Sequence, residues 1–191
     1  MDILMIAVVD CEDSYVNNLV AMIRAAGEEV SVIPEKDISS LDYMEPDALV
    51  LSPGPGHPSP DRGSWIAFER FVGRIPILGV CLGHQTIVCA SGGQVLCRTE
   101  PTHGRVVSIE HDGRGLFRNA PDHFSAVRYN SLIADPDNIG KDLTINAIDE
   151  YGDVMAVSDI RRKIFGVQFH PESFMTESGE LMIRNFIEAI P

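Results

Sequence analysis

The stretch Ile3-Leu-Met-Ile-Ala-Val-Val9 is an unbroken apolar run that ends at Asp10. A strand with one solvated face alternates apolar and polar residues, whereas a strand buried on both faces is apolar throughout. The run therefore predicts a strand buried on both faces. A parallel sheet covered by helices is the natural host for such a strand.

The segments that follow alternate between strand and helix patterns. Asp13 and Ser14 offer capping oxygens before apolar residues at helical spacing, and Gly27 closes that helix. A βαβα order implies right-handed crossovers and an α/β fold with a doubly wound, mainly parallel central sheet flanked by helices. The further strands are expected at residues 29–33, 48–51 and 75–80, and the next helices at 65–72 and 82–90.

The C-terminal half has a different pattern. After about residue 93, short β-rich segments are separated by Gly, Asp and Lys/Arg turns, which predicts a smaller mixed or antiparallel extension of the sheet. The run Arg161-Arg-Lys163 lies between two of these segments and is interpreted as a solvated turn. The segments are residues 105–110, 144–148, 154–158 and 164–169, followed by a last helix over about 179–190.

Composition narrows the possible classes. The chain has 191 residues, 45% of them hydrophobic, which is enough to bury one sizeable core, so one domain over residues 1–191 is expected. Lys and Arg number 15 against 28 Asp and Glu, and the net charge of −13 repels phosphate backbones and anionic lipids. Nucleic acid and membrane are not expected as partners. The run at residues 3–9 is too short to span a bilayer, and a cytoplasmic protein is expected.

Four cysteines fit neither paired metal-binding motifs nor a disulfide-stapled domain, so reduced thiols are expected. Free cysteine is among the most buried residue types, and each one is first interpreted as a small core residue. Only local context can overturn that interpretation. The four are Cys11, Cys81, Cys89 and Cys97.

The strongest local signal for chemistry is Gly79-Val-Cys81-Leu-Gly83, between an expected buried strand and an expected helix. Glycines on both sides allow a sharp turn that raises the central side chain above the sheet. The N–H groups and dipole at a helix start also favour a thiolate over a thiol. This setting makes Cys81 a candidate nucleophile, while Cys89 and Cys97 have no such setting.

A thiolate nucleophile needs a base and a group that orients the base. His170-Pro-Glu172 stands at the end of the strand expected over residues 164–169. Because the ends of parallel strands meet at one edge of a sheet, His170 can approach Cys81, and Glu172 can hold the imidazole. For this tripeptide alone, a strand-end histidine beside a solvated glutamate is a slightly better interpretation.

A third segment, Ser52-Pro-Gly-Pro-Gly-His-Pro58, directly follows the strand expected at residues 48–51. Its glycines permit backbone angles that expose N–H groups to a ligand. In a carboxamide hydrolase such donors form an oxyanion hole, worth about 2.7–4 kcal/mol per donor. In isolation, an ordinary Pro/Gly turn is the commoner interpretation.

Taken jointly, these blocks, extended to Gly79-Val-Cys-Leu-Gly-His-Gln85 and Phe165-Gly-Val-Gln-Phe-His-Pro-Glu-Ser173, resemble the three signature blocks of class I glutamine amidotransferases. Their order and spacing match, and the resemblance covers essentially the whole chain. It implies Cys81 as nucleophile, His170 as base and Glu172 as the orienting carboxylate. It also implies an oxyanion hole made by the backbone N–H groups of Gly56 and Leu82. The rest of the implied glutamine-binding set is Gly54, Pro55, Gln85, Ser131 and Leu132.

The implied reaction is hydrolysis of L-glutamine through a cysteine thioester, with the ammonia passed to a separate synthase. Within the class, Arg128-Tyr129 ahead of Ser131-Leu132 most resembles the small subunits of anthranilate synthase and aminodeoxychorismate synthase. That implies a larger chorismate-binding partner subunit. No cofactor or metal is implied for this chain, and any Mg²⁺ would belong to the partner. Carbamoyl-phosphate synthetase small subunits share much of the pattern but carry a large extra N-terminal domain.

Two departures from the family pattern stand out. Asn130 replaces the histidine of the usual Arg-Tyr-His-Ser-Leu, which keeps hydrogen bonding but loses any titratable role. The opening block Asp10-Cys-Glu-Asp-Ser-Tyr15 replaces the commoner Asp-Asn-Tyr-Asp-Ser-Phe. Two alternatives remain, a stand-alone γ-glutamyl cysteine hydrolase and a non-catalytic supporting subunit. The intact triad residues argue against the second.

Overall fold

The computed structural model describes residues 3–97 and 104–191. The helices are α1 (Val16–Ala25), α2 (Gly63–Phe71), α3 (Leu82–Ala90) and α4 (Gly179–Ile187), with 3₁₀ helices η1 (Glu35–Tyr43) and η2 (Gly115–Phe117). The strands are β1 (Met5–Asp10), β2 (Glu29–Pro34), β3 (Ala48–Leu51), β4 (Ile77–Val80), β5 (Val95–Cys97), β6 (Arg105–His111), β7 (His123–Arg128), β8 (Leu132–Ala134), β9 (Thr144–Asp149), β10 (Val154–Asp159) and β11 (Ile164–Val167).

These strands form one sheet in the order β2-β1-β3-β4-β11-β10-β9-β6-β7. Every pairing from β2 to β11 is parallel, and every pairing from β11 to β7 is antiparallel. A ribbon of β5 and β8 joins the side of β10. The expected α/β fold, a mainly parallel sheet with an antiparallel extension, is therefore confirmed.

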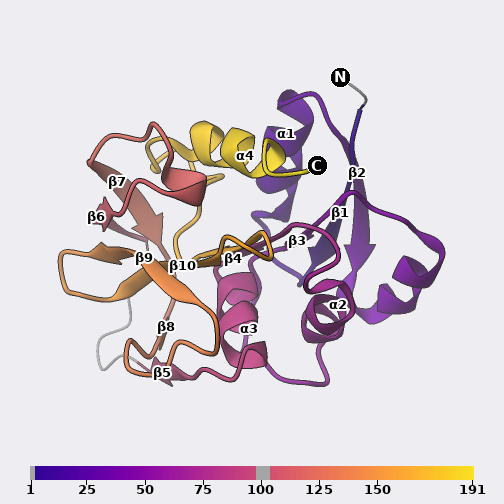
Figure 1. The fold of residues 1–191 in the computed structure, drawn as a ribbon, viewed down its shortest axis with the longest axis horizontal. Coiled ribbons are helices and arrows are strands. Elements are labelled where there is room, and N and C mark those ends of the chain that lie inside the picture. The colour runs from indigo at the N-terminus through magenta and orange to yellow at the C-terminus, as the bar shows by residue number, and fades with distance from the viewer. Residues whose placement is uncertain (1–2, 98–103) are drawn as a thin grey trace.

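Helices cover both faces of the parallel part (Figure 1). Successive residues of β1 face opposite sides, so that Ile6 and Val8 enter one core cluster while Ala7 and Val9 enter the other. The first cluster lies under α1 and α4, and the second lies under α2 and α3. All four β1 side chains are fully buried, which explains the unbroken apolar run.

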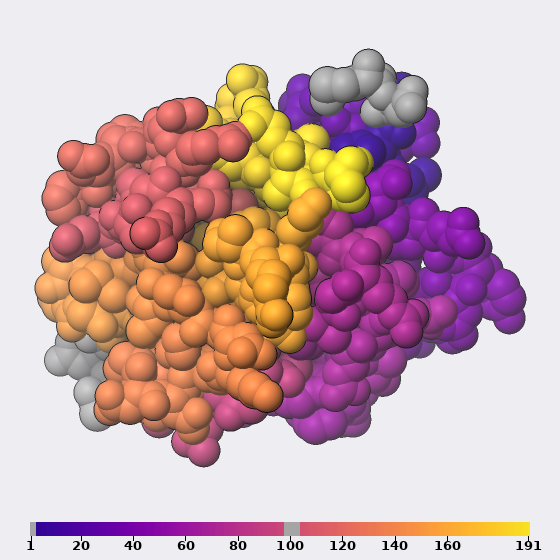
Figure 2. All heavy atoms as spheres, in the orientation of Figure 1, coloured from indigo at the N-terminus to yellow at the C-terminus, as the bar shows by residue number. Residues whose placement is uncertain are grey.

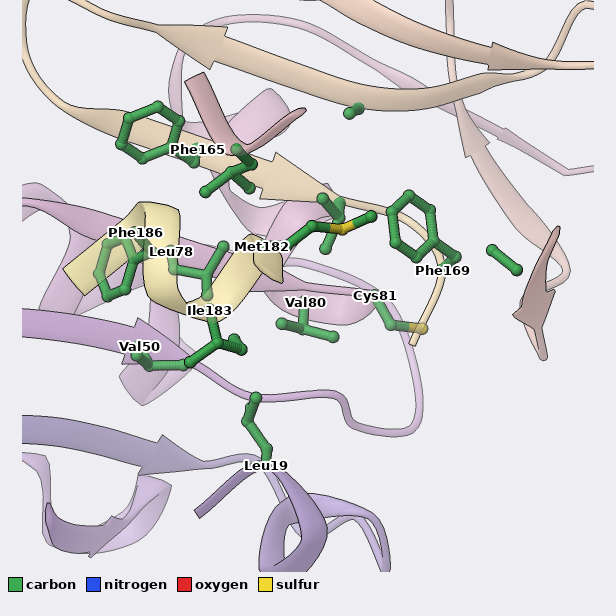
Figure 3. Close-up of a cluster of buried hydrophobic side chains, with 14 of the residues drawn as sticks. Leu19, Val50, Leu78, Val80, Cys81, Phe165, Phe169, Met182, Ile183 and Phe186 are labelled. Atoms are coloured by element: carbon green, nitrogen blue, oxygen red, sulfur yellow. The ribbon is translucent and has the colours of Figure 1, made fainter. Parts of the chain in front are cut away.

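The cluster under α1 and α4 includes Cys81, whose side chain lies near those of Val80 and Phe169 (Figure 3). Because the thiol residue is continuous with packed core, its backbone is held by rigid surroundings. The labelled members are Leu19 from α1, Met182, Ile183 and Phe186 from α4, and Val50, Leu78, Val80, Phe165 and Phe169 from strands or strand ends.

Helix α4 lies between α1 and η2. In Figure 2 its yellow surface separates the indigo N-terminal segment from the coral segment around η2. The Asn185 side chain donates hydrogen bonds to the carbonyls of Leu116 (2.7 Å) and Arg118 (2.9 Å). These bonds fix α4 against η2, beside the antiparallel extension.

Several expectations need correction. The expected strand over residues 164–169 ends at Val167, that over 75–80 begins at Ile77, and the last helix ends at Ile187. The buried apolar side chains of α4 are those of Met182, Ile183, Phe186 and Ile187, whereas Leu181 is only half-buried. Strands β5, β7 and β8 and the helix η1 were not expected. Strands β5 and β8 have three residues each and η1 is a largely polar 3₁₀ helix, so these three elements leave little periodic signal.

Three smaller expectations can be checked at chain turns. Neither Asp13 nor Ser14 caps α1, because the N-cap residue is Tyr15 and no side chain bonds to the helix start. Asp13 Oδ1 instead accepts the N–H of Tyr15 (2.7 Å), just before the helix. Gly27, with φ of 102°, ends that helix as predicted. The run at 161–163 is a turn between β10 and β11, also as predicted. No helix within residues 3–97 and 104–191 is long and apolar enough to cross a membrane.

Candidate active site

Cys81 occupies the turn between β4 and α3, as its cap residue, with φ of 52° and ψ of −102°. A non-glycine residue with positive φ stores about 1–3 kcal/mol of strain and persists only when its surroundings impose it. Here the Cys81 N–H donates to the Val167 carbonyl (2.8 Å), and the Cys81 carbonyl accepts the N–H of Gln85 (3.1 Å). The predicted sharp turn from strand to helix is confirmed.

The two flanking glycines are required by close packing. A Cβ on Gly79 would lie 2.5 Å from the carbonyl of Gly83. A Cβ on Gly83 would lie 2.2 Å from the Leu51 carbonyl oxygen. The first turn of α3 therefore presses directly on β3 and β4, which places the thiol over the carboxyl end of the parallel sheet.

His170 and Glu172 lie where the parallel pairing predicts. Val80 of β4 is the register partner of Val167 of β11, so the residues that follow the two strands emerge side by side. The His170 Nδ1 lies 2.6 Å from Glu172 Oε1, and both side chains are almost fully buried. The carboxylate thus orients the imidazole through Nδ1. The other ring nitrogen, Nε2, remains for proton transfer.

The pKa of His170 is strongly raised by its surroundings. Burial alone would lower the pKa of His170, but the Cys81 side chain and the Glu172 carboxylate outweigh it and raise that pKa to about 10. Nε2 makes no hydrogen bond of ordinary geometry to any residue that the structure describes. Cys81 therefore raises the pKa of His170 as a close neighbour, without a hydrogen bond of ordinary geometry to Nε2. A protonated imidazole at neutral pH follows.

Two tyrosines enclose the imidazole, a feature that no sequence pattern predicted. The rings of Tyr15 and Tyr129 stack at 5.4 Å, and each meets the His170 ring edge-on, at 5.4 and 5.2 Å. A hydrogen bond with Tyr15, together with burial, raises the pKa of Tyr129 to about 12, so this phenol stays neutral. The pair restricts rotation of the imidazole and shields it from water on that side.

The glycine-rich segment after β3 lies against the Cys81 turn. A Cβ on Gly54 would fall 2.6 Å from Cys11 Cβ and 2.7 Å from a methyl group of Leu82. Gly56, at φ of 87°, adopts a backbone conformation that other residues rarely adopt. Gly54 is half-buried, while Pro55 and Gly56 are exposed. The segment thus brings exposed backbone close to the start of α3.

Gln85 and the 131–132 segment are also brought together. Gln85 Nε2 donates to the Leu132 carbonyl (3.1 Å) and to Gln168 Oε1 (3.1 Å). The Leu132 carbonyl accepts a second bond from Asn130 Nδ2 (2.6 Å). Because both of its lone pairs are occupied, any further contact from this segment falls to Ser131 or to backbone N–H groups.

A model of the glutamine amidotransferase class-I family matches residues 7–190. The chain belongs to this family. It is 42% identical over 187 residues to the aminodeoxychorismate/anthranilate synthase component 2 of Bacillus subtilis (strain 168), covering 96% of each chain. It is 46% identical over 185 residues to anthranilate synthase component 2 of Archaeoglobus fulgidus, covering 96% of this chain and 97% of that protein.

The fold has a solved counterpart. The crystal structure of a putative GMP synthase subunit from Thermoplasma acidophilum superposes with a TM-score of 0.85 at 26% identity, covering 100% of this chain and 95% of that chain. A glutamine amidotransferase is thus an enzyme class consistent with a thiol, an imidazole and a carboxylate gathered at one sheet edge.

In this amidotransferase Asn130 links the 131–132 segment to a buried ion cluster. Asn130 Oδ1 accepts from Nε of Arg128 (3.1 Å), whose side chain is fully buried. Arg128 Nη1 donates to Asp149 Oδ2 (2.5 Å) and Asp153 Oδ2 (2.7 Å). No sequence pattern indicated this cluster, because its members are brought together only by β7, β9 and β10.

Arg128→Met is expected to lower the free energy of unfolding by about 3–5 kcal/mol, because it leaves two buried carboxylates without their cation. Urea denaturation at neutral pH measures this loss. Arg161→Met, in the exposed turn after β10, is the matched control and should change stability by less than about 0.5 kcal/mol. A loss below about 1 kcal/mol for Arg128→Met would contradict the assignment of a desolvated cluster.

Cys11, Cys89 and His84 behave as structural groups, whereas Cys97 does not. Burial raises the pKa of Cys11 to about 12, and burial also raises the pKa of Cys89. Cys97 is exposed on β5, so its interpretation as a core residue was wrong. Burial lowers the pKa of His84, next to Gln85 in the signature block, to about 4 and keeps it neutral. Its Nδ1 lies where a Cβ on Gly166 would approach to 2.8 Å.

Proposed function

We propose that this amidotransferase is the glutaminase subunit of a chorismate-using synthase of the anthranilate or aminodeoxychorismate type. It hydrolyses L-glutamine on Cys81 and passes ammonia to a larger synthase chain. The observation that carries the proposal is the strained thiol at the start of α3 beside the buried His170–Glu172 pair. The names of the similar proteins support the chorismate-using partner.

In the first half of the reaction, the Cys81 sulfur attacks the side-chain amide carbon of glutamine and forms a C–S bond. Negative charge develops on the amide oxygen, where the N–H groups of Gly56 and Leu82 stabilise it. The C–N bond then breaks, and the His170 imidazolium gives its Nε2 proton to the leaving nitrogen. Ammonia departs and a γ-glutamyl thioester remains.

In the second half, neutral His170 takes a proton from water through the same Nε2. The hydroxide attacks the thioester carbon, the C–S bond breaks, and glutamate is released with the thiolate restored. Glu172 holds the imidazole in one orientation and stabilises its charged form through both steps. Gln85 and Ser131, on the two segments joined at Leu132, flank the substrate as positioning residues.

The pure chain is expected to be a weak glutaminase that gains about 10²-fold in kcat/KM when its synthase binds. Pro55 and Gly56 are exposed, so water competes for the oxyanion donors until a partner covers them. In addition, no residue that the structure describes makes a hydrogen bond of ordinary geometry to Nε2 of His170. Steady-state glutamate release is measured with and without saturating synthase.

The same assay separates the alternatives. Equal kcat/KM in both conditions would favour a stand-alone γ-glutamyl hydrolase and overturn partner gating. Chorismate, glutamine and the larger synthase chain together should give an aminated product, and its identification by mass spectrometry assigns the anthranilate or the aminodeoxychorismate type. A complex that forms but releases no glutamate would favour a supporting, non-catalytic subunit.

A further inference from the structure

An arginine outside the signature blocks binds the glycine-rich segment after β3, which carries the Gly56 N–H of the proposed oxyanion hole. Arg62, the residue before α2, donates from Nη1 to the carbonyl oxygen of Pro55 at 2.8 Å. The same nitrogen would lie 3.3 Å from a Cβ on Gly56. The guanidinium therefore lies directly against the Pro55–Gly56 peptide unit, whose N–H the proposed function places in the oxyanion hole.

Arg62 is itself held in place. Its Nε and Nη2 donate to Glu35 Oε1 (3.0 Å) and Oε2 (2.6 Å), a two-pronged ion pair. Glu35 Oε1 also accepts the N–H (3.0 Å) and hydroxyl (2.7 Å) of Ser64. The side chains of Arg62 and Glu35 are only 19% and 15% exposed. A shielded, bidentate pair of this kind fixes the guanidinium much better than an exposed pair would.

The direction of the Gly56 N–H follows from peptide geometry. In a trans peptide the C=O and N–H point in opposite directions, so fixing the Pro55 carbonyl also fixes the Gly56 N–H. Glu35 follows β2, whereas Cys81 follows β4, and β3 lies between β1 and β4 in the sheet. The carbonyl is drawn toward the β2 side, which turns the N–H toward the β4 side.

We propose that Arg62, held by Glu35, is a positioning residue that keeps the Gly56 N–H directed at the reacting carbonyl above Cys81. This inference rests on the proposed glutaminase function and adds a determinant of its oxyanion hole. Without Arg62, the Pro55–Gly56 peptide unit can rotate at small cost, because Gly56 permits a wide range of backbone angles. The Gly56 N–H would then point away from the reacting carbonyl for much of the time.

The test uses the complex with its synthase and the variants Arg62→Ala and Arg62→Lys. Arg62→Ala should lower kcat for glutamine hydrolysis by about 10²-fold, because one oxyanion donor is lost, with KM changed less than about threefold. Arg62→Lys, which can reach Pro55 but cannot form the two-pronged pair, should fall between Arg62→Ala and the parent. Amination from added ammonia and alkylation of Cys81 by iodoacetamide should stay within about twofold, since neither needs the oxyanion hole.

Arg70→Ala is the matched control. Arg70 lies in α2 and forms an ion pair with Asp42 of η1, so it joins the same two elements as Arg62 and Glu35. Its loss should leave kcat unchanged. An Arg62→Ala enzyme with kcat within about threefold of the parent would overturn the inference. So would a parallel fall in iodoacetamide reactivity, or an equal fall in Arg70→Ala, because either would indicate general loosening.

Failure of the proposed function gives a different pattern. In that case the parent complex itself releases no glutamate, whatever residue stands at position 62. If Arg62→Ala does not fold, Arg62→Lys decides: it should keep the parent KM and lose kcat, whereas a full parent kcat would overturn the role of the two-pronged pair.

Discussion

Replacing Cys81 with Ala should abolish glutamine-dependent amination, with a fall of about 10⁴-fold or more, because no thioester can form. Amination from added ammonia by the synthase complex should stay within about twofold of the parent value. Ammonia enters the reaction after the step that Cys81 performs, and alanine fits the buried site without adding volume. Both rates are measured on the same complex at saturating chorismate.

The other thiols provide the controls. A glutamine-like electrophile such as 6-diazo-5-oxo-norleucine should label Cys81 alone, as peptide mass spectrometry can show. Cys97→Ala is the most important control variant, because Cys97 is the exposed thiol and the one most open to nonspecific reagents. Labelling at Cys89 or Cys97, or a Cys81→Ala enzyme that still uses glutamine, would remove Cys81 from the mechanism.

Much of the fold and the centre of the site could be predicted because they follow from local pattern. The unbroken run in β1 reflects burial on both faces, and Gly79 and Gly83 reflect backbone contacts closer than any side chain allows. The approach of His170 to Cys81, far apart in the sequence, followed from one rule, that parallel strands end at the same sheet edge. The register of β4 with β11 confirms that rule here.

The supporting contacts could not be predicted, because they depend on which side chains meet after the sheet has formed. Arg62 reaches Glu35 across 27 positions, from the start of one helix to an unexpected 3₁₀ helix. Arg128 ends β7, whereas Asp149 and Asp153 flank the turn between β9 and β10, so they meet only after the sheet has formed. Tyr15 looked like a minor departure in the opening block, yet its ring covers the catalytic candidate His170. A single sequence carries no periodic signal for such pairs.

His170→Ala and changes at Glu172 should cause unequal losses. His170→Ala should lower kcat by about 10⁴-fold or more, because both proton transfers lose their only carrier. Glu172→Gln should retain roughly 10²-fold more activity than His170→Ala, since the amide oxygen can still accept from Nδ1 and orient the ring. Glu172→Ala, which loses orientation as well as charge, should fall below Glu172→Gln. Glutamate release by each complex gives the order.

The pH profile separates the charge of Glu172 from its orienting role. The proposed first step needs the imidazolium, so kcat/KM should fall as pH rises through the pKa of His170, which is raised to about 10. Glu172 is one cause of that raised value, and its neutral replacement lowers the pKa of His170. The alkaline limb of Glu172→Gln should therefore begin at a lower pH than that of the parent, while Tyr15 and Tyr129 still confine the ring. An unchanged alkaline limb together with full activity would mean that this carboxylate, although 2.6 Å from Nδ1, does not stabilise the charged imidazole during turnover.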